Sequence, residues 1–372
     1  MAMAMAILDV IAVPRSSLRL THHHRTLNAS SPHHLLRQPP PLPFHVLKQQ
    51  RKSKKHPGLR KACCVVVVCV SAPAVIINEE QANNRAVDST ELLACPICFE
   101  PLLRRGPLGV NIYRSAISRS AFSCKKCKKT YSNREVYLDL TVTAGSKTFK
   151  EVQPAGTELF RNPWVSFVYE RGWRQSFSTS GFPGPDEELN MAQGFFKPRF
   201  GGVLLDVSCG SGLFSRRFVQ SGAYSTIIAL DYSENMLRQC YEFIKQDKSI
   251  TTETIALVRA DVARLPFASE TIDAIHAGAA LHCWPSPSSG VAEISRILRP
   301  GGIFVASTFL RPSNLGTELL KPLRQIFGQS FSRNVRYWEE SELEDLVRSC
   351  GLVRYKSIRR GSFIMLSAKK PD

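Results

Sequence analysis

Between residues 200 and 310, short apolar runs alternate with segments that read as helices. The runs are apolar almost throughout, as strands buried on both faces of a sheet are. They comprise residues 202–207, 225–231, 255–261 and 272–282. A helix, a turn at Pro300, Gly301 and Gly302, and a fifth strand follow. This order predicts an α/β fold built on a mostly parallel sheet.

The segments on either side extend this pattern. The amphipathic stretch EESELEDLVRSCGL predicts a helix that ends at Gly351, and VRYKSIRRGSFIMLSAKK after it predicts a hairpin. Residues 157–200 are rich in aromatic side chains and are a candidate lid over a binding site. An ordinary helix pair packed on the sheet is the alternative for this segment. The insert at residues 311–338 is a second candidate lid.

The first 78 residues have the composition of an organelle-targeting segment. They contain 11 Lys and Arg, a single acid, seven of the nine His and a proline-rich stretch at residues 39–43. The Ser-rich, acid-poor start favours a plastid over a mitochondrion. We therefore predict a disordered plastid transit peptide over residues 1–70 and a linker over 71–91. A disordered tail without a targeting role is the alternative.

The net charge of +18 is concentrated in the first 150 residues. Residues 151–372 contain 26 Lys and Arg against 23 Asp and Glu. A domain so close to neutral gives little support to binding of a nucleic-acid backbone. The apolar run at 62–77 is shorter than the about 17–25 residues of a membrane span, so we expect no transmembrane segment.

Four of the eleven cysteines form two pairs, CPIC at residues 95–98 and CKKC at residues 124–127. Two such pairs place four thiolates around Zn²⁺, and the strand-like residues between them predict a hairpin. The spacing thus predicts a structural zinc site in this segment. Its ligands would be Cys95, Cys98, Cys124 and Cys127. Two disulfides or free thiols are the alternative.

The first apolar run leads into the loop DVSCGSG. Gly210 and Gly212 allow the backbone to approach a ligand closely, but the third glycine of a dinucleotide-binding GxGxxG loop is missing. Asp206 at the end of the run suits a ligand that carries an ammonium group. Asp231 and Asp261 end the next two runs, where they suit ribose hydroxyls and an adenine amino group. Each residue alone is equally consistent with a cap or a turn.

In order and spacing, these blocks resemble the motifs of the class I S-adenosylmethionine-dependent methyltransferases. The family pattern is acid-x-Gly-x-Gly-x-Gly, so Ser208 replaces the first glycine, and its hydroxyl could bind the cofactor's amino-acid end. The resemblance implies a Rossmann-like, mostly parallel seven-stranded sheet over residues 201–372, with the last strand antiparallel. Residues 143–200 would form a linker and helical lid. Residues 92–142, which contain both cysteine pairs, are similar to the zinc ribbon ahead of some methyltransferase domains, including those of a plant plastid group, so the resemblance implies a zinc ribbon over this range.

The resemblance also implies S-adenosylmethionine as cofactor. Its expected contacts are Asp206, Ser208, Gly210, Gly212, Asp231, Tyr232, Met236, Asp261, Val262 and Gly278. His282 lies near the end of the fourth run, where this family faces its acceptor, and is the candidate general base; a structural role is the alternative. His276, inside that run, is expected to be a hydrogen-bonded core residue.

Three functions are consistent with these features. The first is methyl transfer in the plastid, in the stroma or at lipid such as a plastoglobule, to a small lipophilic or quinone-like acceptor. The second is ribosomal RNA guanine methylation, with RNA docked on the ribbon. The third is a non-catalytic scaffold that retains the cofactor. The nearly neutral domain and its aromatic segment favour the first.

Overall fold

The computed structural model describes residues 92–105, 121–149, 151, 158, 160–173, 177–178, 181–250, 255–311 and 336–372. All of them belong to one compact unit that includes Arg85–Asp372. The transit peptide and linker predicted over residues 1–91 lie outside the described residues. Most of the second candidate lid, residues 312–335, does so too.

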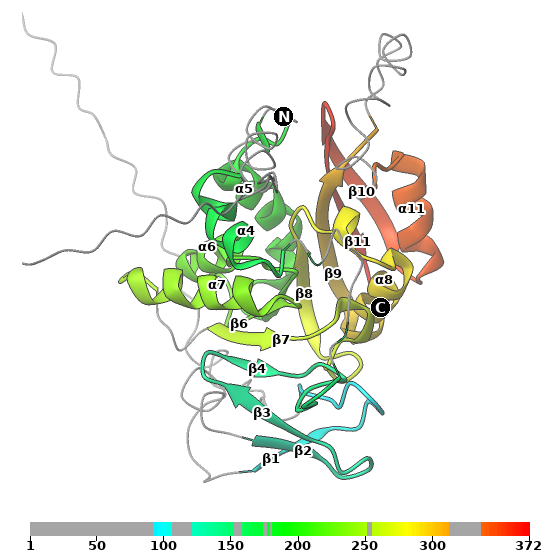
Figure 1. Ribbon diagram of the computed structural model, residues 1–372. Coiled ribbons are helices and arrows are strands. Elements are labelled where there is room, and N and C mark those ends of the chain that lie inside the picture. The colour runs from blue at the N-terminus through cyan, green and yellow to red at the C-terminus, as the bar shows by residue number, and fades with distance from the viewer. Residues whose placement is uncertain are drawn as a thin grey trace, which may run out of the picture. The chain divides into compact units, whose positions relative to one another are not determined.

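A single 11-stranded sheet organises this unit (Figure 1). Its strand order is β1-β2-β3-β4-β7-β6-β5-β8-β9-β11-β10. The strands are β1 Leu102–Arg105, β2 Ala121–Cys124, β3 Thr130–Arg134, β4 Tyr137–Asp139, β5 Val203–Val207, β6 Thr226–Asp231, β7 Ile255–Arg259, β8 Ile272–Ala277, β9 Leu298–Phe309, β10 Val353–Arg360 and β11 Phe363–Lys369. Strands β7, β6, β5, β8 and β9 are parallel, whereas β11 is antiparallel to both β9 and β10. The predicted Rossmann-like sheet with an antiparallel last strand is confirmed.

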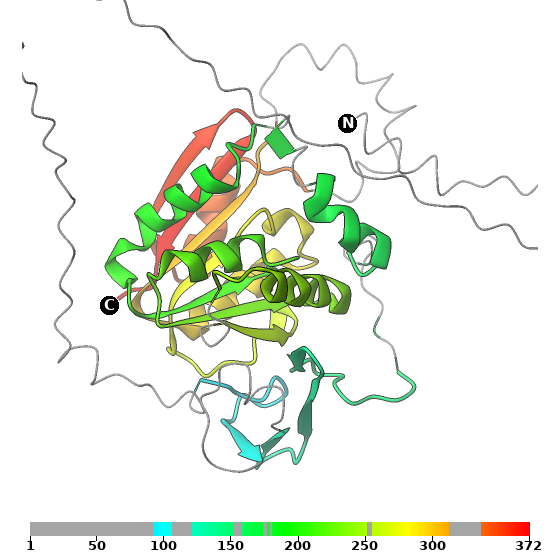
Figure 2. The ribbon, with the colours of Figure 1, turned by 90° about the vertical axis from the view of Figure 1, so that its left-hand side faces the viewer.

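Helices cover both faces of the sheet, with α5, α6 and α7 on one face and α8 and α11 on the other (Figures 1 and 2). On β5, Leu204 packs in the cluster under α5–α7, and its neighbour Leu205 packs in the cluster under α8 and α11. This two-sided burial explains why the strand was recognisable as a continuous apolar run. The helices are α4 Pro163–Val168, α5 Pro185–Phe196, α6 Leu213–Ser221, α7 Glu234–Gln246, α8 Pro287–Ile297 and α11 Glu340–Ser349. Short turns are η2 Tyr169–Trp173, η4 Lys197–Arg199, η5 Val262–Arg264 and η6 Leu281–Cys283.

Two boundaries differ from the sequence-based expectation. Strand β8 ends at Ala277 because Gly278 and then Ala279, with φ 51°, turn the chain away. His282 consequently lies in the turn η6 and not at the end of the strand. The Pro300–Gly302 turn is a bulge inside β9, where the pairing with β8 changes register.

The ribbon continues the sheet instead of standing apart from it. Strands β1–β4 pair antiparallel, with β1 opposite β2. Residues 106–120, which include most of the strand-like stretch of the predicted hairpin, lie outside the described part. β4 then pairs parallel with β7, with Leu138 opposite Val258. Phe122 and Tyr131 of the ribbon belong to the same buried cluster as side chains of β5 and α8. The ribbon and the larger sheet therefore share one hydrophobic core.

Candidate functional site

A pocket lies beyond the carboxyl ends of β5, β6, β7 and β8, where open α/β sheets bind their ligands. Eight predicted residues line it: Ser208, Gly210, Asp231, Tyr232, Met236, Asp261, Val262 and Gly278. The wall is completed by Phe160, Arg161, Tyr169, Leu230, Ser233, Ala260, Ala279, Ala280, Cys283, Trp284 and Pro285. Among these, only Phe160 and Tyr169 had a signal in the sequence, as aromatic residues of the candidate lid.

Asp231 organises the glycine loop. One carboxylate oxygen accepts a hydrogen bond from the Gly210 N–H and the other accepts one from the Ser233 N–H, both at 2.8 Å. Burial raises the pKa of Asp231 to about 6, although these backbone hydrogen bonds oppose the shift. Each oxygen keeps a further lone pair for ribose hydroxyls.

Asp261 lines the same pocket and lies two residues after the end of β7. It caps the turn η5 by accepting a hydrogen bond from the Ala263 N–H at 2.9 Å. Apolar side chains of Val262, Met236 and Leu230 lie in the same wall. The two carboxylates can accept hydrogen bonds from the polar groups of an adenosine, and the apolar side chains can contact its flat base. The residues that line the pocket therefore fit S-adenosylmethionine.

Ser208 has φ 55°, a left-handed conformation that favours glycine, and this explains the glycine of the family pattern. The strain costs roughly 1 kcal/mol. The Ser208 hydroxyl accepts a hydrogen bond from Trp284 Nε1 at 3.0 Å, which fixes the indole in the pocket wall. A contact of this hydroxyl with the cofactor's amino-acid end stays a prediction.

Asp206 and Gly212 are absent from the pocket's lining. Asp206 is 2% exposed, lies 2.8 Å from His276 Nδ1 and accepts a hydrogen bond from Ser215. His276 is thus hydrogen-bonded in the core, as expected. A Cβ added to Gly212 would lie 2.2 Å from the Cys240 sulfur, so this glycine permits the close approach of α6 and α7. Direct cofactor contacts of Asp206 and Gly212 stay predictions.

The segment 160–173 closes one side of the pocket. The rings of Phe160 and Tyr169 meet edge to face at 6.0 Å. Glu170 accepts a hydrogen bond from the Ser211 hydroxyl at 2.6 Å, which ties the segment to the glycine loop. By contrast, α5 packs against the sheet through Ala192 and Phe196. The first half of the candidate lid thus borders the pocket, and the second half is a sheet-covering helix.

His282 is 8% exposed and is not among the residues that line the cofactor pocket. Its Nδ1 is 3.3 Å from the Thr308 hydroxyl, and its ring packs edge to face on Phe309 at 4.8 Å. Burial lowers the pKa of His282 to about 4. The ring is therefore neutral at pH 7, but burial disfavours its protonated form and makes it a weak base. Its role as general base stays a prediction.

The sulfur atoms of the four paired cysteines all lie within 4.8 Å of one another. The sulfur distances are 3.5 Å for Cys95–Cys127 and 3.4 Å for Cys98–Cys124. A disulfide would need about 2 Å. A tetrahedron of Zn–S bonds of about 2.3 Å has edges near 3.8 Å. The residue after each pair, Phe99 and Lys128, has φ 59°, so both turns end alike. The geometry fits Zn²⁺ and not a pair of disulfides.

Cys95 shows how the turn favours a thiolate. Burial acts to raise its pKa, but hydrogen bonds from the Tyr131 hydroxyl and from the backbone of Cys98 and Ile97 bring the pKa down to about 7. The Tyr131 oxygen lies 3.1 Å from the sulfur. Metal ligands need deprotonated sulfur, and the surroundings of Cys95 favour it. By contrast, against opposing backbone hydrogen bonds, desolvation and the neighbouring cysteines raise the pKa of Cys98 to about 11 and also raise that of Cys127.

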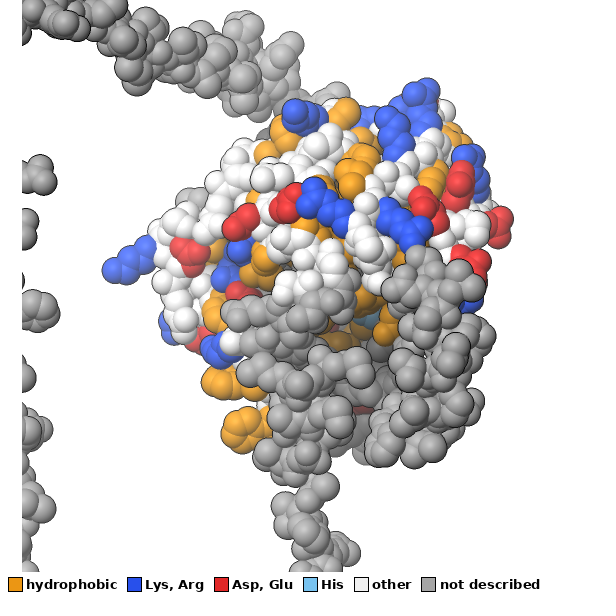
Figure 3. Space-filling view, turned by 90° about the horizontal axis from the view of Figure 1, so that it is seen from above, with side chains coloured by type: hydrophobic (Ala, Val, Ile, Leu, Met, Phe, Trp, Pro, Cys, Tyr) orange, Lys and Arg blue, Asp and Glu red, His pale blue; other side chains and the backbone are white. Residues whose placement is uncertain are grey.

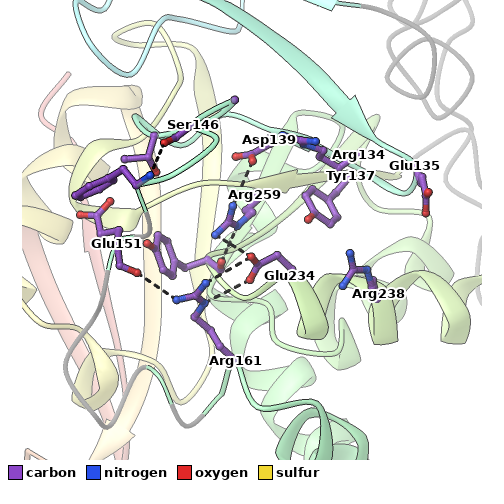
Figure 4. Close-up of a pocket in the computed structure, with 14 residues that line it drawn as sticks. Arg134, Glu135, Tyr137, Asp139, Ser146, Glu151, Arg161, Glu234, Arg238 and Arg259 are labelled. Carbon is purple, nitrogen blue, oxygen red and sulfur yellow. Dashed lines mark hydrogen bonds and ion pairs between the residues drawn. The ribbon is translucent and has the colours of Figure 1, made fainter.

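A second cavity, of about 440 Å³, lies where the ribbon meets α7 and β7 (Figure 4). Arg259 is at its centre, 3.2 Å from Asp139 of β4 and 3.3 Å from Glu234 of α7. Arg161 lies 3.4 Å from Glu234. Arg161 and Tyr232 line both this cavity and the cofactor pocket, so the ion pairs connect the ribbon to the pocket's rim.

Comparison with known proteins agrees with this architecture. A family model described as a methyltransferase domain matches residues 205–306. A chloroplastic methyltransferase of Arabidopsis thaliana is 56% identical over 295 residues, 79% of this chain and 82% of that protein. A second one from the same plant is 52% identical over 297 residues, with the same coverage of 79% and 82%. The demethylmenaquinone methyltransferase of Desulfitobacterium hafniense is 25% identical over 271 residues, 66% of this chain and 99% of that protein.

The strand order, the acids at the ends of β6 and β7 and these relatives agree with one another. The chain belongs to the class I S-adenosylmethionine-dependent methyltransferases.

Proposed function

We propose that the protein works in the plastid and methylates a small, apolar acceptor of the quinone class. The two Arabidopsis relatives are named chloroplastic, and the D. hafniense relative is named for a quinone acceptor. The observation that carries the acceptor class is a group of aromatic side chains that contacts His282 of the turn η6, whose next residue, Cys283, lines the cofactor pocket. The group consists of Phe177, Phe182, Phe309, Tyr337 and Phe363, with His282 at its edge.

Phe309 is the centre of this aromatic group. Its ring lies 4.7 Å from the Phe182 ring, 5.6 Å from Phe177 and 4.8 Å from His282. Phe182 and Phe363 belong to the buried core, whereas Phe177, Phe309 and Tyr337 are half-buried and are the rings that a flat apolar acceptor would meet in this proposal. On the described part of the face seen from above, Lys and Arg side chains are interspersed with acidic and apolar ones (Figure 3). RNA docking calls for a more continuous basic surface.

The roles of the chain's residues follow from their positions. Asp231 and Asp261 hold the ribose and the adenine, and the loop at Ser208–Gly212 faces the cofactor's charged end. S-adenosylmethionine supplies an activated methyl carbon when bound. The segment 160–173 excludes water and aligns the reactants, an effect worth up to several kcal/mol. His282 accepts a proton where the acceptor atom must lose one.

The four paired cysteines hold a structural Zn²⁺ in this proposal. Of the lysines around the second pair, Lys129 donates a hydrogen bond to the Val142 carbonyl, and Lys126 lies 3.4 Å from Glu100. These contacts use basic side chains within the protein. No helix in the described ranges is long and apolar enough to cross a bilayer. Contact with plastid lipid would then be peripheral, through the acceptor.

Transfer of a labelled methyl group tests the proposal. The purified full chain and methyl-labelled S-adenosylmethionine are added to a plastid extract, which is then separated into lipid, RNA and protein fractions. Asp231→Asn removes the ribose-binding charge. Glu242→Gln removes an exposed charge from α7 and is the matched control.

We expect label in the lipid fraction with the wild type and Glu242→Gln, and loss of that label with Asp231→Asn. Label in RNA would contradict the acceptor class and support RNA methylation. Cofactor binding without label in any fraction would support the non-catalytic scaffold.

A further inference from the structure

We infer that the ribbon braces two walls of the cofactor pocket, so that metal binding and S-adenosylmethionine binding strengthen one another. The inference rests on the proposed function in one respect, since it takes the four paired cysteines as the metal ligands. Two arginines of the larger sheet domain, Arg264 and Arg259, make the connecting contacts.

The first contact joins the CPIC turn to the loop that follows Asp261. The Arg264 guanidinium donates one hydrogen bond to the carbonyl of Pro96 and another, at 2.6 Å, to the carbonyl of Ile97. Both carbonyls lie between the two cysteines of the turn, whose backbone a bound metal would fix. Arg264 ends η5, and Val262 at the start of η5 lines the cofactor pocket.

Backbone pairing strengthens this junction. The Ala94 N–H donates to the Pro266 carbonyl, and the Ala268 N–H donates to the Leu92 carbonyl, both at 2.9 Å. Residues 92–94, immediately before the CPIC turn, thus pair antiparallel with residues 266–268, which continue the loop after Asp261; we call residues 262–268 the cofactor loop. Because these hydrogen bonds hold the two segments together, a displacement of the CPIC turn also displaces the cofactor loop.

Phe99 adds a side-chain lock directly after the turn. Its ring centroid lies 4.7 Å from the Arg264 guanidinium and 4.3 Å from that of Arg296. Arg296 in turn donates hydrogen bonds to the carbonyls of Leu265 and Phe267, at 2.9 and 2.8 Å. The same aromatic ring therefore contacts two arginines that hold the cofactor loop.

The second contact reaches the ribose side of the pocket (Figure 4). Asp139 of β4 pairs with Arg259, whose Nε donates to the Tyr232 carbonyl at 3.1 Å. The Arg259 guanidinium also lies 5.3 Å from the centre of the Tyr232 ring. Tyr232 directly follows Asp231 and lines the pocket. The ribbon therefore supports the residues beside both acidic positions.

Metal loss should weaken this support because short segments of this kind depend on the metal for their fold. The carbonyl acceptors of Arg264 then lose their fixed positions, and the cofactor must order the loop when it binds. Linkage makes the effect reciprocal, so bound cofactor must tighten metal binding by the same factor. A factor of about ten lies within the range that such couplings span.

Calorimetry on the full chain tests the coupling without measuring turnover. The Kd of S-adenosylhomocysteine is measured for zinc-loaded protein and for protein stripped with a chelator. Zinc affinity is measured by chelator competition with and without S-adenosylhomocysteine. We expect both ratios to be equal and about tenfold.

Two variants identify the route of the coupling. Arg264→Gln should keep one zinc per chain but bring both ratios close to one. Phe99→Leu, which keeps an apolar side chain, should also lower both affinity ratios toward one. It replaces Arg264→Gln in the test if that variant does not fold. Glu242→Gln removes one exposed charge on α7, outside both cysteine turns, and should keep the wild-type ratios.

The outcomes separate the inference from the function. Zinc binding with an unchanged cofactor Kd contradicts the coupling and leaves the proposed function standing. A chain that binds cofactor but no zinc overturns the metal assignment and the coupling together. A coupling that survives intact in both Arg264→Gln and Phe99→Leu contradicts the assigned route.

Discussion

Gly212→Ala tests the distinction between a glycine that serves the cofactor and one that serves packing. Gly212 has φ 78°, and an added Cβ would lie 2.2 Å from the Cys240 sulfur on α7. The left-handed backbone costs an alanine about 1–2 kcal/mol. Overpacking adds about 1–3 kcal/mol, and the stiffer unfolded chain returns about 0.5 kcal/mol. We expect the free energy of unfolding to fall by about 2–4 kcal/mol.

Two companion variants separate the cost of the left-handed backbone from the cost of the steric clash. Gly210→Ala has a similar backbone penalty at φ 56°, but its nearest neighbour is Tyr169 Cε1 at 3.5 Å, an ordinary contact. It should cost about 1–2 kcal/mol. Cys240→Ala removes the clashing sulfur, so Gly212→Ala combined with Cys240→Ala should be more stable than the sum of the single changes by about 1–3 kcal/mol.

Urea unfolding followed by circular dichroism measures the wild type and the four variants, and calorimetry gives the cofactor Kd of those that fold. Gly212→Ala should lose stability and, once folded, keep most of its cofactor affinity. The packing role of Gly212 would be refuted if Gly212→Ala and Gly210→Ala were equally stable. It would also be refuted if the effects of Gly212→Ala and Cys240→Ala were additive.

Three further predictions concern titration, the acceptor and the metal. The pKa of Asp231 is about 6, so cofactor affinity should be constant from pH 7 to 8 and fall up to about tenfold per pH unit below 6; a flat Kd from pH 5 to 8 contradicts this. His282→Ala should lower kcat by about 10²–10⁴ if the histidine is the base, while the pKa of about 4 keeps the wild-type kcat level down to about pH 5. Unchanged turnover would remove His282 from the chemistry. Cys98→Ser should abolish one-to-one zinc binding, seen by elemental analysis, and lower the Tm by about 2–4 °C for each kcal/mol lost; full zinc content would count against the ligand assignment.

The acids at the sheet's edge were predictable because their signal is local. Asp231 and Asp261 follow runs buried on both faces, and parallel strands place their carboxyl ends together. The same reasoning predicts a cofactor contact for Asp206, which stays a prediction, but it did not reveal that one carboxylate oxygen lies 2.8 Å from His276 Nδ1. The direction of a side chain near the end of a strand depends on residues that are distant in the sequence. For Asp206 the partner is His276 on the neighbouring strand β8.

The junction between ribbon and sheet could not be predicted for a related reason. The pairing of Leu138 with Val258 joins residues far apart in the chain, and nothing in the short strand β4 specifies that partner. His282 was placed too near a strand end because the apolar composition continues past Ala277. The positive φ of Ala279, which ends the strand, has no marker in an apolar sequence.

Equilibrium binding of S-adenosylmethionine tests the central claim, that the pocket at Asp231 and Asp261 is the cofactor site. The account predicts one cofactor per wild-type chain. It also predicts about 10- to 150-fold weaker binding to Asp231→Asn, as expected when hydrogen bonds to a charged group worth about 1.5–3 kcal/mol are lost. Glu242→Gln should bind like the wild type. No binding to the wild type, or equal affinity in Asp231→Asn, would contradict the account.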